Sequence, residues 1–331
     1  MLMPITITST APCRADLAGG TLDIWPLGLL HNKALTVNMA LPVSVVLEVS
    51  NDAPDTVVLH RVSGGPWRSL RPGDTSNDLT AAICFHLAPR GGLKVDVLSQ
   101  APMGSGLGGS SAFGVALTRA AAKISNLDFS DEQIVHLVQD LEARLLGTLT
   151  GCQDHWAAVR GGIQALHLEP GGNRLERLCT DHRWLESRVT VFFTGITHHS
   201  GMVNWQIIRR RLEGDRKTTQ ALQLIADAAN LCRTALLSAD CDALGNALRQ
   251  EWAARRRLAP EICPPELAHL EAEAMEAGAL AFKACGAGGG GSVLILHEPA
   301  MADPIAEALM STAPAGELFP RGVAVDGCNV I

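Results

Sequence analysis

The chain has 331 residues, of which 47% are hydrophobic and 18% are charged, so it can bury a sizeable core. Its formal net charge of −7 excludes a nucleic-acid binder with a dominant basic surface. Two arginine runs, 209–211 and 255–257, follow helical stretches, and we interpret both as solvated helix faces. No apolar stretch approaches the ~20 residues that a membrane helix needs.

The nine cysteines lie singly along the chain, and no two of them form a C-x-x-C pair. The sequence therefore predicts neither a zinc ribbon nor a dithiol redox motif. An odd number of cysteines and a first segment without a secretion signal are typical of a cytoplasmic protein. We expect no nucleic-acid or membrane partner, and the sequence leaves open whether the protein is a monomer or a homodimer.

The alternation of apolar and polar residues predicts mainly strands over the first hundred residues. Residues 34–50 alternate and are rich in valine, and they predict a strand, a turn and a second strand. Residues 11–28 are punctuated by glycine and proline and predict a loop. The other predicted elements are strands at 5–10, 55–63 and 93–100, and a helix at 75–89 that begins at Ser76 or Asn77.

Helical periodicity dominates after residue 110. Ser130 and Gln133 have the spacing of a capping box, and Gly147 ends the same apolar pattern, so residues 130–147 predict a helix with defined ends. The remaining predicted helices are 111–125, 202–248 with an interruption near Gly214, 264–284 and 302–312. The remaining predicted strands are 161–170, 187–196 and 322–331, and residues 286–298 predict a glycine loop that leads into a strand. This order favours an α+β fold with two subdomains that meet near residues 170–190.

The stretch "APMGSGLGGSSAFG", residues 101–114, follows a predicted strand and contains the pattern G-x-G-x-x-G. In a dinucleotide-binding fold a second strand with an acidic end would follow the next helix. Here a loop and another helix follow, which argues against that fold, and the chain contains no Walker P-loop pattern. Glycines before a helix can instead expose backbone N–H groups to phosphate. A simple strand–turn–helix hinge does not require five glycines and a serine pair.

Four separated stretches together resemble the motifs of the GHMP kinases, the superfamily of galactokinase, homoserine kinase, mevalonate kinase and phosphomevalonate kinase. They are "APCRADLAGGTLD" (11–23), "PMGSGLGGSSA" (102–112), "GTLTGCQDHWAAVRGG" (147–162) and "CGAGGGGSVLIL" (285–296). Their order and spacing match along the whole chain, most closely in the heptose 7-phosphate kinase and fucokinase-like branch.

The resemblance implies a GHMP kinase fold in two parts. The first, residues 1–180, would be an ATP-binding domain similar to domain 2 of ribosomal protein S5. The second, residues 181–331, would be ferredoxin-like. ATP would bind between them with Mg²⁺, and the chain would be a kinase of a sugar or sugar phosphate.

The resemblance also assigns roles to individual residues. Asp154 would accept the proton of the attacking hydroxyl, and Arg14 would offset charge on the transferred phosphoryl group. Ser110 and Glu142 would hold Mg²⁺. The nucleotide phosphates would be bound by Pro102, Gly104, Ser105, Gly106, Leu107, Gly108, Gly109, Ser110 and Ser111, and the acceptor by Asp23, Gly19, Gly20, Gly288 and Gly289.

The chain departs from the family pattern at several of these positions. Gly109 stands where a first serine is usual, His155 where the branch usually has Gln, and His198 where it often has Arg. Residues 19–21, Gly-Gly-Thr, replace the Gly-Glu-His of galactokinases, which argues against galactose as the substrate. His198 and His199 are adjacent and have no third ligand at useful spacing, so we predict no metal site there.

The chain contains no tyrosine, so any stacking on a sugar must use tryptophan or phenylalanine, and Trp25, Trp156 and Trp205 are the candidates. Three other functions stay open at this point. They are a mevalonate-type kinase of another small molecule, a non-catalytic regulator that binds nucleotide or sugar on the same fold, and an NAD-dependent oxidoreductase.

Overall fold

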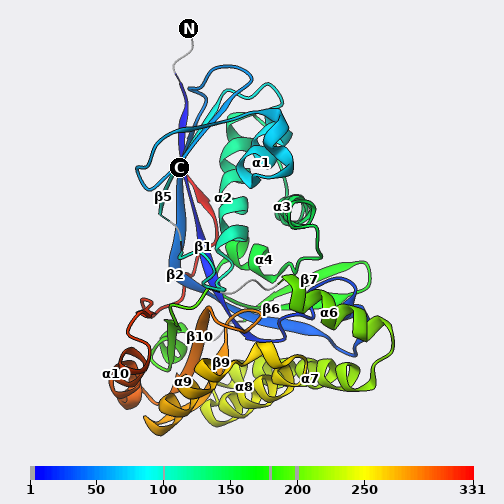
Figure 1. Cartoon of the computed structure of the whole chain (residues 1–331), viewed down its shortest axis with the longest axis vertical. Helices are drawn as coiled ribbons and strands as arrows, with labels where there is room; N and C mark the ends of the chain where they lie inside the picture. The colour runs from blue at the N-terminus through cyan, green and yellow to red at the C-terminus, as the bar shows by residue number, and fades with distance from the viewer. Residues whose placement is uncertain (1–3, 100, 179–180, 198–200) are drawn as a thin grey trace.

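The computed structural model describes residues 4–99, 101–178, 181–197 and 201–331, and it has the α+β architecture that the sequence predicts. Two long strands, β1 (Thr6–Ala18) and β2 (Leu35–Ser50), pair antiparallel and run from the upper part of the molecule into the lower part (Figure 1). They are the centre of an eight-stranded sheet. Its other strands are β3 (Val58–Val62), β4 (Arg68–Leu70), β5 (Leu93–Ser99), β6 (Ile163–Glu169), β7 (Gly172–Arg177) and β12 (Asn329–Val330).

Helices cover one face of this sheet in the upper part of the molecule (Figure 1). They are α1 (Leu79–Leu87), α2 (Gly109–Ile124), α3 (Asp131–Leu146) and α4 (Gln153–Arg160). The core between α2 and the sheet contains small residues, including Ala112, Ala116 and Ala120, all fully buried. Small side chains let α2 approach the strands closely, which fixes the glycine stretch at its N-terminus against β1.

The lower part is built on a four-stranded antiparallel sheet in the order β11-β8-β10-β9. Its strands are β8 (Val189–Phe193), β9 (Ala279–Ala284), β10 (Ser292–His297) and β11 (Glu317–Leu318). The helices are α5 (His182–Glu186), α6 (Gly201–Leu212), α7 (Arg216–Ser238), α8 (Cys241–Arg256), α9 (Pro265–Glu276) and α10 (Ala302–Thr312). Short 3-10 turns complete the chain at Leu27–Leu30, Pro72–Ser76, Pro260–Ile262 and Pro299–Met301.

The structure corrects two predictions about the first long strands. Residues 11–18 belong to β1 and not to a loop, and residues 34–50 contain one strand and not two. Prolines misled both predictions. The pairing of β1 with β2 shifts register between Pro12 and Arg14, opposite the stretch of β2 that contains Pro42. A proline is tolerated in a strand at such an irregularity, because no ladder hydrogen bond is lost there.

Four further predictions about element boundaries were wrong. Residues 202–248 contain a second break after Ser238, and the last of the three helices, α8, continues to Arg256. The first helix begins after Asp78, which accepts the N–H of Ala81, and not after Ser76 or Asn77. Residues 264–284 form α9 and then β9, separated by Gly278 at φ +102°. Of residues 322–331, only Asn329–Val330 form a strand, which pairs with β1.

The predicted ends of α3 are confirmed. The capping box of α3 forms as the sequence indicates, because the Ser130 hydroxyl accepts the N–H of Gln133 while the Gln133 side chain accepts the N–H of Ser130. Gly147 ends α3 in the left-handed conformation at φ +62°. The eight described cysteines are free, and no helix in the described part of the chain is long and apolar enough to cross a membrane.

Candidate functional site

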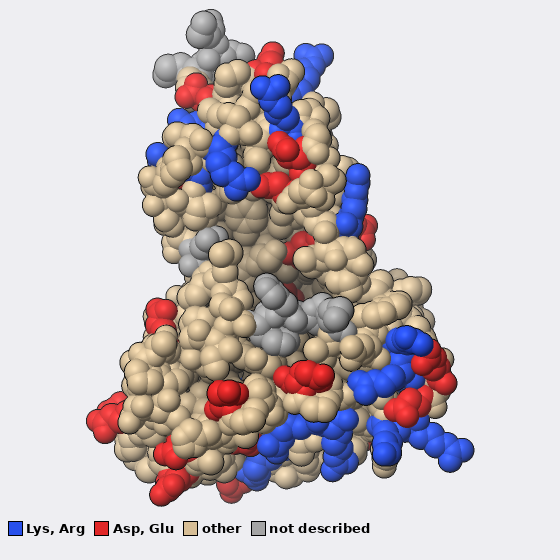
Figure 2. Space-filling view, viewed as in Figure 1, with Lys and Arg blue, Asp and Glu red and all other residues tan. Residues whose placement is uncertain are grey.

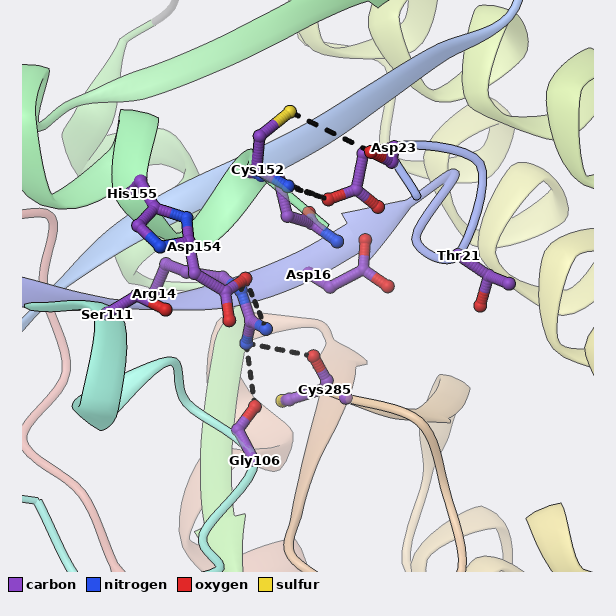
Figure 3. Close-up of polar contacts among 12 residues, drawn as sticks. Arg14, Asp16, Thr21, Asp23, Gly106, Ser111, Cys152, Asp154, His155 and Cys285 are labelled. Atoms are coloured by element: carbon purple, nitrogen blue, oxygen red, sulfur yellow. Dashed lines mark hydrogen bonds and ion pairs between the residues drawn. The ribbon is translucent and has the colours of Figure 1, made fainter. Parts of the chain in front are cut away.

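The candidate site lies where the upper and lower parts of the molecule meet. The space-filling view is hollowed at this level, and acidic side chains are visible in the recess (Figure 2). Because β1 is a strand, Arg14 and Asp16 point to the same face of the sheet. Both side chains are buried, and they lie beside the glycine loops described below (Figure 3).

Arg14 and Asp154 form an ion pair although 139 residues lie between them in the sequence. The Nε of Arg14 donates to Oδ1 of Asp154 at 2.7 Å. Arg14 is 6% exposed and Asp154 26%, so the carboxylate is the more accessible partner. Burial would lower the pKa of Arg14, but Asp154 and Asp16 outweigh it and raise that pKa, so the guanidinium stays charged.

Arg14 also joins two glycine loops (Figure 3). Its Nη1 donates to the backbone oxygen of Gly106 at 2.7 Å and to that of Cys285 at 3.1 Å. Gly106 belongs to the loop before α2, and Cys285 begins the loop that follows β9. One side chain therefore contacts three of the four family-like stretches through Asp154, Gly106 and Cys285.

The loop before α2 has the backbone of a tight cradle. Gly104, Gly106 and Gly108 all have φ between +71° and +73°, a conformation that favours glycine. A Cβ added to Gly108 would lie 3.0 Å from the side chain of Asp154, so this loop passes directly over the acidic group. Gly109 and Ser110 begin the sixteen-residue helix α2, whose first N–H groups have no partner within the helix.

The other predicted members of this loop differ in accessibility. Ser105 and Leu107 are buried, Pro102 is half-buried, and Ser110 is exposed. The backbone oxygen of Ser105 accepts the N–H of Ser292 at 2.7 Å, and the backbone oxygen of Leu107 accepts the N–H of Arg14 at 2.9 Å. These bonds hold the loop to β10 and β1.

Glu142 is a buried carboxylate with three side-chain partners. It accepts hydrogen bonds from the hydroxyls of Ser110 and Ser111, and its Oε2 lies 2.8 Å from Nε2 of His155. Burial would raise the pKa of Glu142, but the charge and hydrogen bond of His155, with the two serines, outweigh it and lower that pKa. The same interaction raises the pKa of His155 against the effect of its burial. His155, a departure from the family pattern, is therefore the direct partner of Glu142.

Asp23 caps the helix that carries Asp154. Its Oδ2 accepts the backbone N–H of Cys152 at 2.8 Å and of Gln153 at 3.0 Å, at the start of α4 (Figure 3). Burial raises the pKa of Asp23 despite these two bonds. The loop Gly19–Asp23, which we call the acceptor loop, is thus tied to the helix of Asp154.

Glycines in the acceptor loop have no room for a side chain. A Cβ on Gly19 would lie 2.2 Å from the backbone oxygen of Leu35, and one on Gly20 would lie 2.4 Å from Oδ2 of Asp16 and 2.9 Å from Nη2 of Arg255. Position 20 is where galactokinases carry glutamate. In this chain an ion pair of Asp16 and Arg255 fills that space.

Gly288 and Gly289, in the loop after β9, lie against the 3-10 turn that contains Ile262. The N–H of Gly289 donates to the backbone oxygen of Ile262 at 2.8 Å, and a Cβ on Gly288 would lie 2.6 Å from the same oxygen. Gly286 is the member of this loop that contacts the loop before α2, since its added Cβ would lie 3.1 Å from the oxygen of Gly106. The two glycine loops therefore meet at Gly106 and Gly286.

The sequence does not predict a group of charged residues that lies under the acceptor loop. The arginine run predicts a solvated face for Arg255, yet it is 2% exposed and is paired with Asp16 and Glu251. Lys283 is fully buried and donates to Asp16. A lysine within the apolar run of β9 is a signal for this group, but the pattern of residues 264–284 predicts a helix there.

A cavity of about 500 Å³ lies between the end of α3 and α6, and it is lined by Ala143, Gly147, Thr148, Leu149 and Trp205. Residues 147–149 belong to the same family-like stretch, 147–162, as Asp154.

The three tryptophans proposed for stacking lie in different surroundings. Trp205 lines this cavity, Trp156 is buried and Trp25 is exposed. His198 and His199, for which we predict no metal site, lie outside the described residues.

Comparison with known proteins agrees with the two-part architecture. The family model of the GHMP kinases N terminal domain matches residues 77–162, and that of the GHMP kinases C terminal domain matches residues 232–315. Several curated relatives extend over most of the chain. A bifunctional fucokinase/GDP-fucose pyrophosphorylase of Arabidopsis thaliana is 28% identical over 87% of this chain, which spans only 30% of that longer protein. A D-glycero-alpha-D-manno-heptose 7-phosphate kinase of Campylobacter jejuni is 29% identical, with 89% of this chain and 90% of the relative covered.

Solved structures share the fold over nearly the whole chain. A D-glycero-D-manno-heptose 1-phosphate kinase from Bacteriodes thetaiotaomicron has a TM-score of 0.74 at 21% identity, with 98% of both chains covered. Lactococcus lactis galactokinase complexed with galactose has a TM-score of 0.79 at 14% identity, with 98% of this chain and 95% of the galactokinase covered. At these identities the structures establish the fold and not the substrate.

Proposed function

The chain belongs to the GHMP kinases, and on that premise we propose that it transfers a phosphoryl group from ATP to a hydroxyl of a sugar or sugar phosphate. The relatives named for a heptose 7-phosphate and for fucose support this class of acceptor. One observation carries the proposal most directly. Asp154, paired with Arg14 and partly exposed, lies against the glycine loop that precedes α2.

We assign the nucleotide phosphates to the loop of residues 102–111. Three glycines with positive φ turn the backbone there, and the loop ends at the N-terminus of α2. Backbone N–H groups and the positive end of a helix dipole attract anions at such a place. Gly109 offers no hydroxyl, so Ser110 is the exposed hydroxyl at the start of α2.

The residues near Ser110 fit Mg²⁺. The ion prefers oxygen ligands from one or two protein side chains together with substrate phosphates. Ser110 and Glu142 supply a hydroxyl and a carboxylate in contact with each other, and the pKa of Glu142 is lowered, so its ionised form is favoured. No group of three or more His, Cys, Asp or Glu within the described chain could form a metal site without substrate. Bound Mg²⁺ would neutralise charge on the phosphates.

Asp154 would act on the acceptor hydroxyl. Its Oδ1 is held by Arg14, and Oδ2 remains to accept the hydroxyl hydrogen and to orient the oxygen for attack. Arg14 holds Asp154 in place through their ion pair and puts a positive charge beside the reacting groups. The protein forms no covalent bond in this scheme, so alignment and electrostatics supply the rate.

The acceptor would lie beside Asp23 and the acceptor loop. Oδ2 of Asp23 is used by α4, and Oδ1 is free of the two backbone bonds and can accept a hydrogen bond from a substrate hydroxyl. Gly19 and Gly20 keep the loop close to β2 and to Asp16. Gly288 and Gly289 lie against Ile262, in the loop whose Gly286 shares Arg255 with the acceptor loop, and we assign them to the acceptor side.

A mevalonate kinase is the second candidate. A mevalonate kinase of Thermococcus onnurineus is 29% identical, but the match covers 62% of this chain and 60% of the relative. The matches named for sugar kinases extend over more of the chain. Mevalonate therefore belongs in the acceptor panel as a competitor of the sugars.

The test is an ADP-release assay with the full chain, ATP and Mg²⁺ over neutral hexoses and heptoses, their phosphates, and mevalonate. We expect release with at least one sugar or sugar phosphate and none with mevalonate. ATP binding without turnover of any acceptor would favour a regulator. Tight binding of NAD and none of ATP would favour an oxidoreductase and overturn the proposal.

A further inference from the structure

Four buried charged side chains lie together beneath the acceptor loop. Asp16 comes from β1, Glu251 and Arg255 from α8, and Lys283 from β9. None of the four side chains is more than 2% exposed. Two are acidic and two are basic, so every charge has a partner of opposite sign. We call these residues the buried charge cluster.

Arg255 is the member of the cluster that reaches the acceptor loop. Its Nε donates to Oε1 of Glu251 at 2.8 Å, and its Nη2 lies 3.2 Å from Oδ2 of Asp16. Beyond these acids, Nη2 donates to the backbone oxygen of Gly20 at 3.0 Å, and Nη1 donates to the hydroxyl of Thr21 at 3.3 Å. The carboxylates therefore fix the guanidinium, and its remaining N–H groups hold the loop.

Thr21 needs such a hold because its backbone is strained. Its φ is +80°, and a β-branched residue is a rare outlier in that region. Such a conformation persists only where the surrounding structure imposes it, and it is commonest at functional sites. Thr21 is buried, and its hydroxyl is held by Arg255, which comes from the lower part of the molecule.

The loop that Arg255 holds ends at Asp23, which caps the helix of Asp154. The same Nη1 lies 3.4 Å from the backbone oxygen of Gly286, where the two glycine loops meet. A single side chain of α8 thus contacts the acceptor side and the neighbouring glycine loop. Arg255 itself is sealed from solvent, so it cannot touch substrate directly.

We propose that Arg255 is a positioning residue, which holds Thr21 in its strained conformation and thereby places Asp23 and the acceptor hydroxyl relative to Asp154. This role rests on the proposed function. It differs from a purely structural role. Substitution of a structural residue would change stability, but it would not raise the KM for the acceptor more than the KM for ATP.

Two substitutions at Thr21 separate these roles. Thr21→Val keeps the β-branched shape and removes the hydroxyl, whereas Thr21→Gly removes both the hydroxyl and the strain. We expect either variant to raise the acceptor KM by roughly tenfold, as for loss of a hydrogen bond to a charged group. The KM for ATP should change less than about twofold, and the melting temperature of Thr21→Gly should equal or exceed that of the wild type.

Arg255→Lys is the conservative partner variant. It retains a positive charge for the two acids but cannot hold Gly20 and Thr21 with the same planar group. In a double-mutant cycle, adding Thr21→Val to Arg255→Lys should raise the acceptor KM no further. Additive effects, or unchanged acceptor KM in both Thr21 variants, would overturn the proposal.

Amide hydrogen exchange supplies a readout that does not depend on turnover. Exchange in residues 19–23 should be roughly tenfold faster in Thr21→Val and Arg255→Lys than in the wild type, without a matching change in α2. Unchanged exchange overturns the positioning role even in an active kinase. A wild-type chain that phosphorylates no acceptor overturns the proposed function instead. The effect of the Arg255–Thr21 contact on acceptor binding is then overturned as well.

Discussion

Two buried arginines, Arg14 and Arg255, connect the two parts of the molecule in different ways. Arg14 pairs with Asp154, which is 26% exposed, and its other bonds go to backbone oxygens. Arg255 pairs with Asp16 and Glu251, which are at most 1% exposed. One ion pair therefore has an accessible acidic partner, and the other is closed to solvent.

The comparison shows that a buried arginine can have one of two roles, and that the exposure of its acidic partner decides which. A carboxylate that retains an accessible oxygen can accept a hydrogen bond from a substrate hydroxyl, and the paired arginine orients the carboxylate. A carboxylate that is closed to solvent can only hold its arginine in one orientation. The other N–H groups of that arginine are then free to bind the nearby loop. We expect substitutions in the first pair to change rate, and those in the second group to change stability and loop geometry.

The largest effect is expected from Asp154→Asn. Asparagine keeps the size of the side chain but cannot take the hydroxyl proton, so kcat should fall by about 10²–10⁴. The melting temperature should also fall, because Arg14 is buried and loses a charged partner, although the amide oxygen can still accept its hydrogen bond. Steady-state ADP release and thermal unfolding measure the two quantities. Asp140→Asn, at an exposed position of α3, is the matched control, and equal activity of Asp154→Asn and the wild type would remove Asp154 from the site.

Lys283→Met should give the next largest effect, on stability. The substitution leaves Asp16 and Glu251 with one cation in place of two, and breaking a buried pair in this way typically costs about 3–5 kcal/mol. Urea unfolding at neutral pH measures the change. Lys217→Met, at an exposed position, should change stability by less than about 0.5 kcal/mol. Similar losses for both variants would show that the buried charge cluster adds nothing specific.

Gly20→Ala tests how tightly the acceptor loop lies on the cluster. Its Cβ would meet Asp16 and Arg255 at distances under 3.0 Å, and overpacking of this kind costs about 1–3 kcal/mol. Gly73→Ala is the control, since nothing lies within 4 Å of its added Cβ. Chemical unfolding of the two variants measures the contrast. A stable Gly20→Ala variant with normal acceptor KM would show that the loop can move away from the cluster.

The smallest effect is expected at a third ion pair, outside the site. The hydrogen bond from Arg233, with that from His167, lowers the pKa of Glu176 to about 2. A depressed carboxylate pKa stabilises the fold above the unfolded value of about 4.5, and this stability is lost as pH falls toward 2. Glu176→Gln should therefore be less stable than the wild type at pH 6, by at most about 1 kcal/mol, and the gap should close by pH 2–3. A gap that does not depend on pH in chemical unfolding would contradict this assignment.

The order of the motifs was enough to predict the family, and the periodicity and order of the predicted elements were enough to predict the α+β class and most helices. The motifs also put Arg14 and Asp154 in one predicted site, and the two side chains pair in the structure. The capping box at Ser130 is a local pattern, and local patterns survive in the fold. These successes rest on signals that lie within a few residues of one another or within one motif.

The failures have long-range causes. Pro12 looked like a loop residue, and the tolerance for it comes from a register shift against β2, far along the chain. Arg255 looked like a member of a solvated arginine run, and its burial depends on Asp16, 239 residues earlier. No pattern near either residue contains this information. The partner of Glu142 was missed for the same reason, since His155 belongs to a different helix.

The long strand pair bears on how the protein unfolds. The strands β1 and β2 belong to the upper sheet and also pack against α7 of the lower part, while α8 packs against β1 (Figure 1). Neither part can lose its structure without uncovering apolar surface of the other. The two parts, although matched by separate family models, therefore form one cooperative unit, in which a defect in the lower helices lowers the free energy of unfolding of the upper part as well.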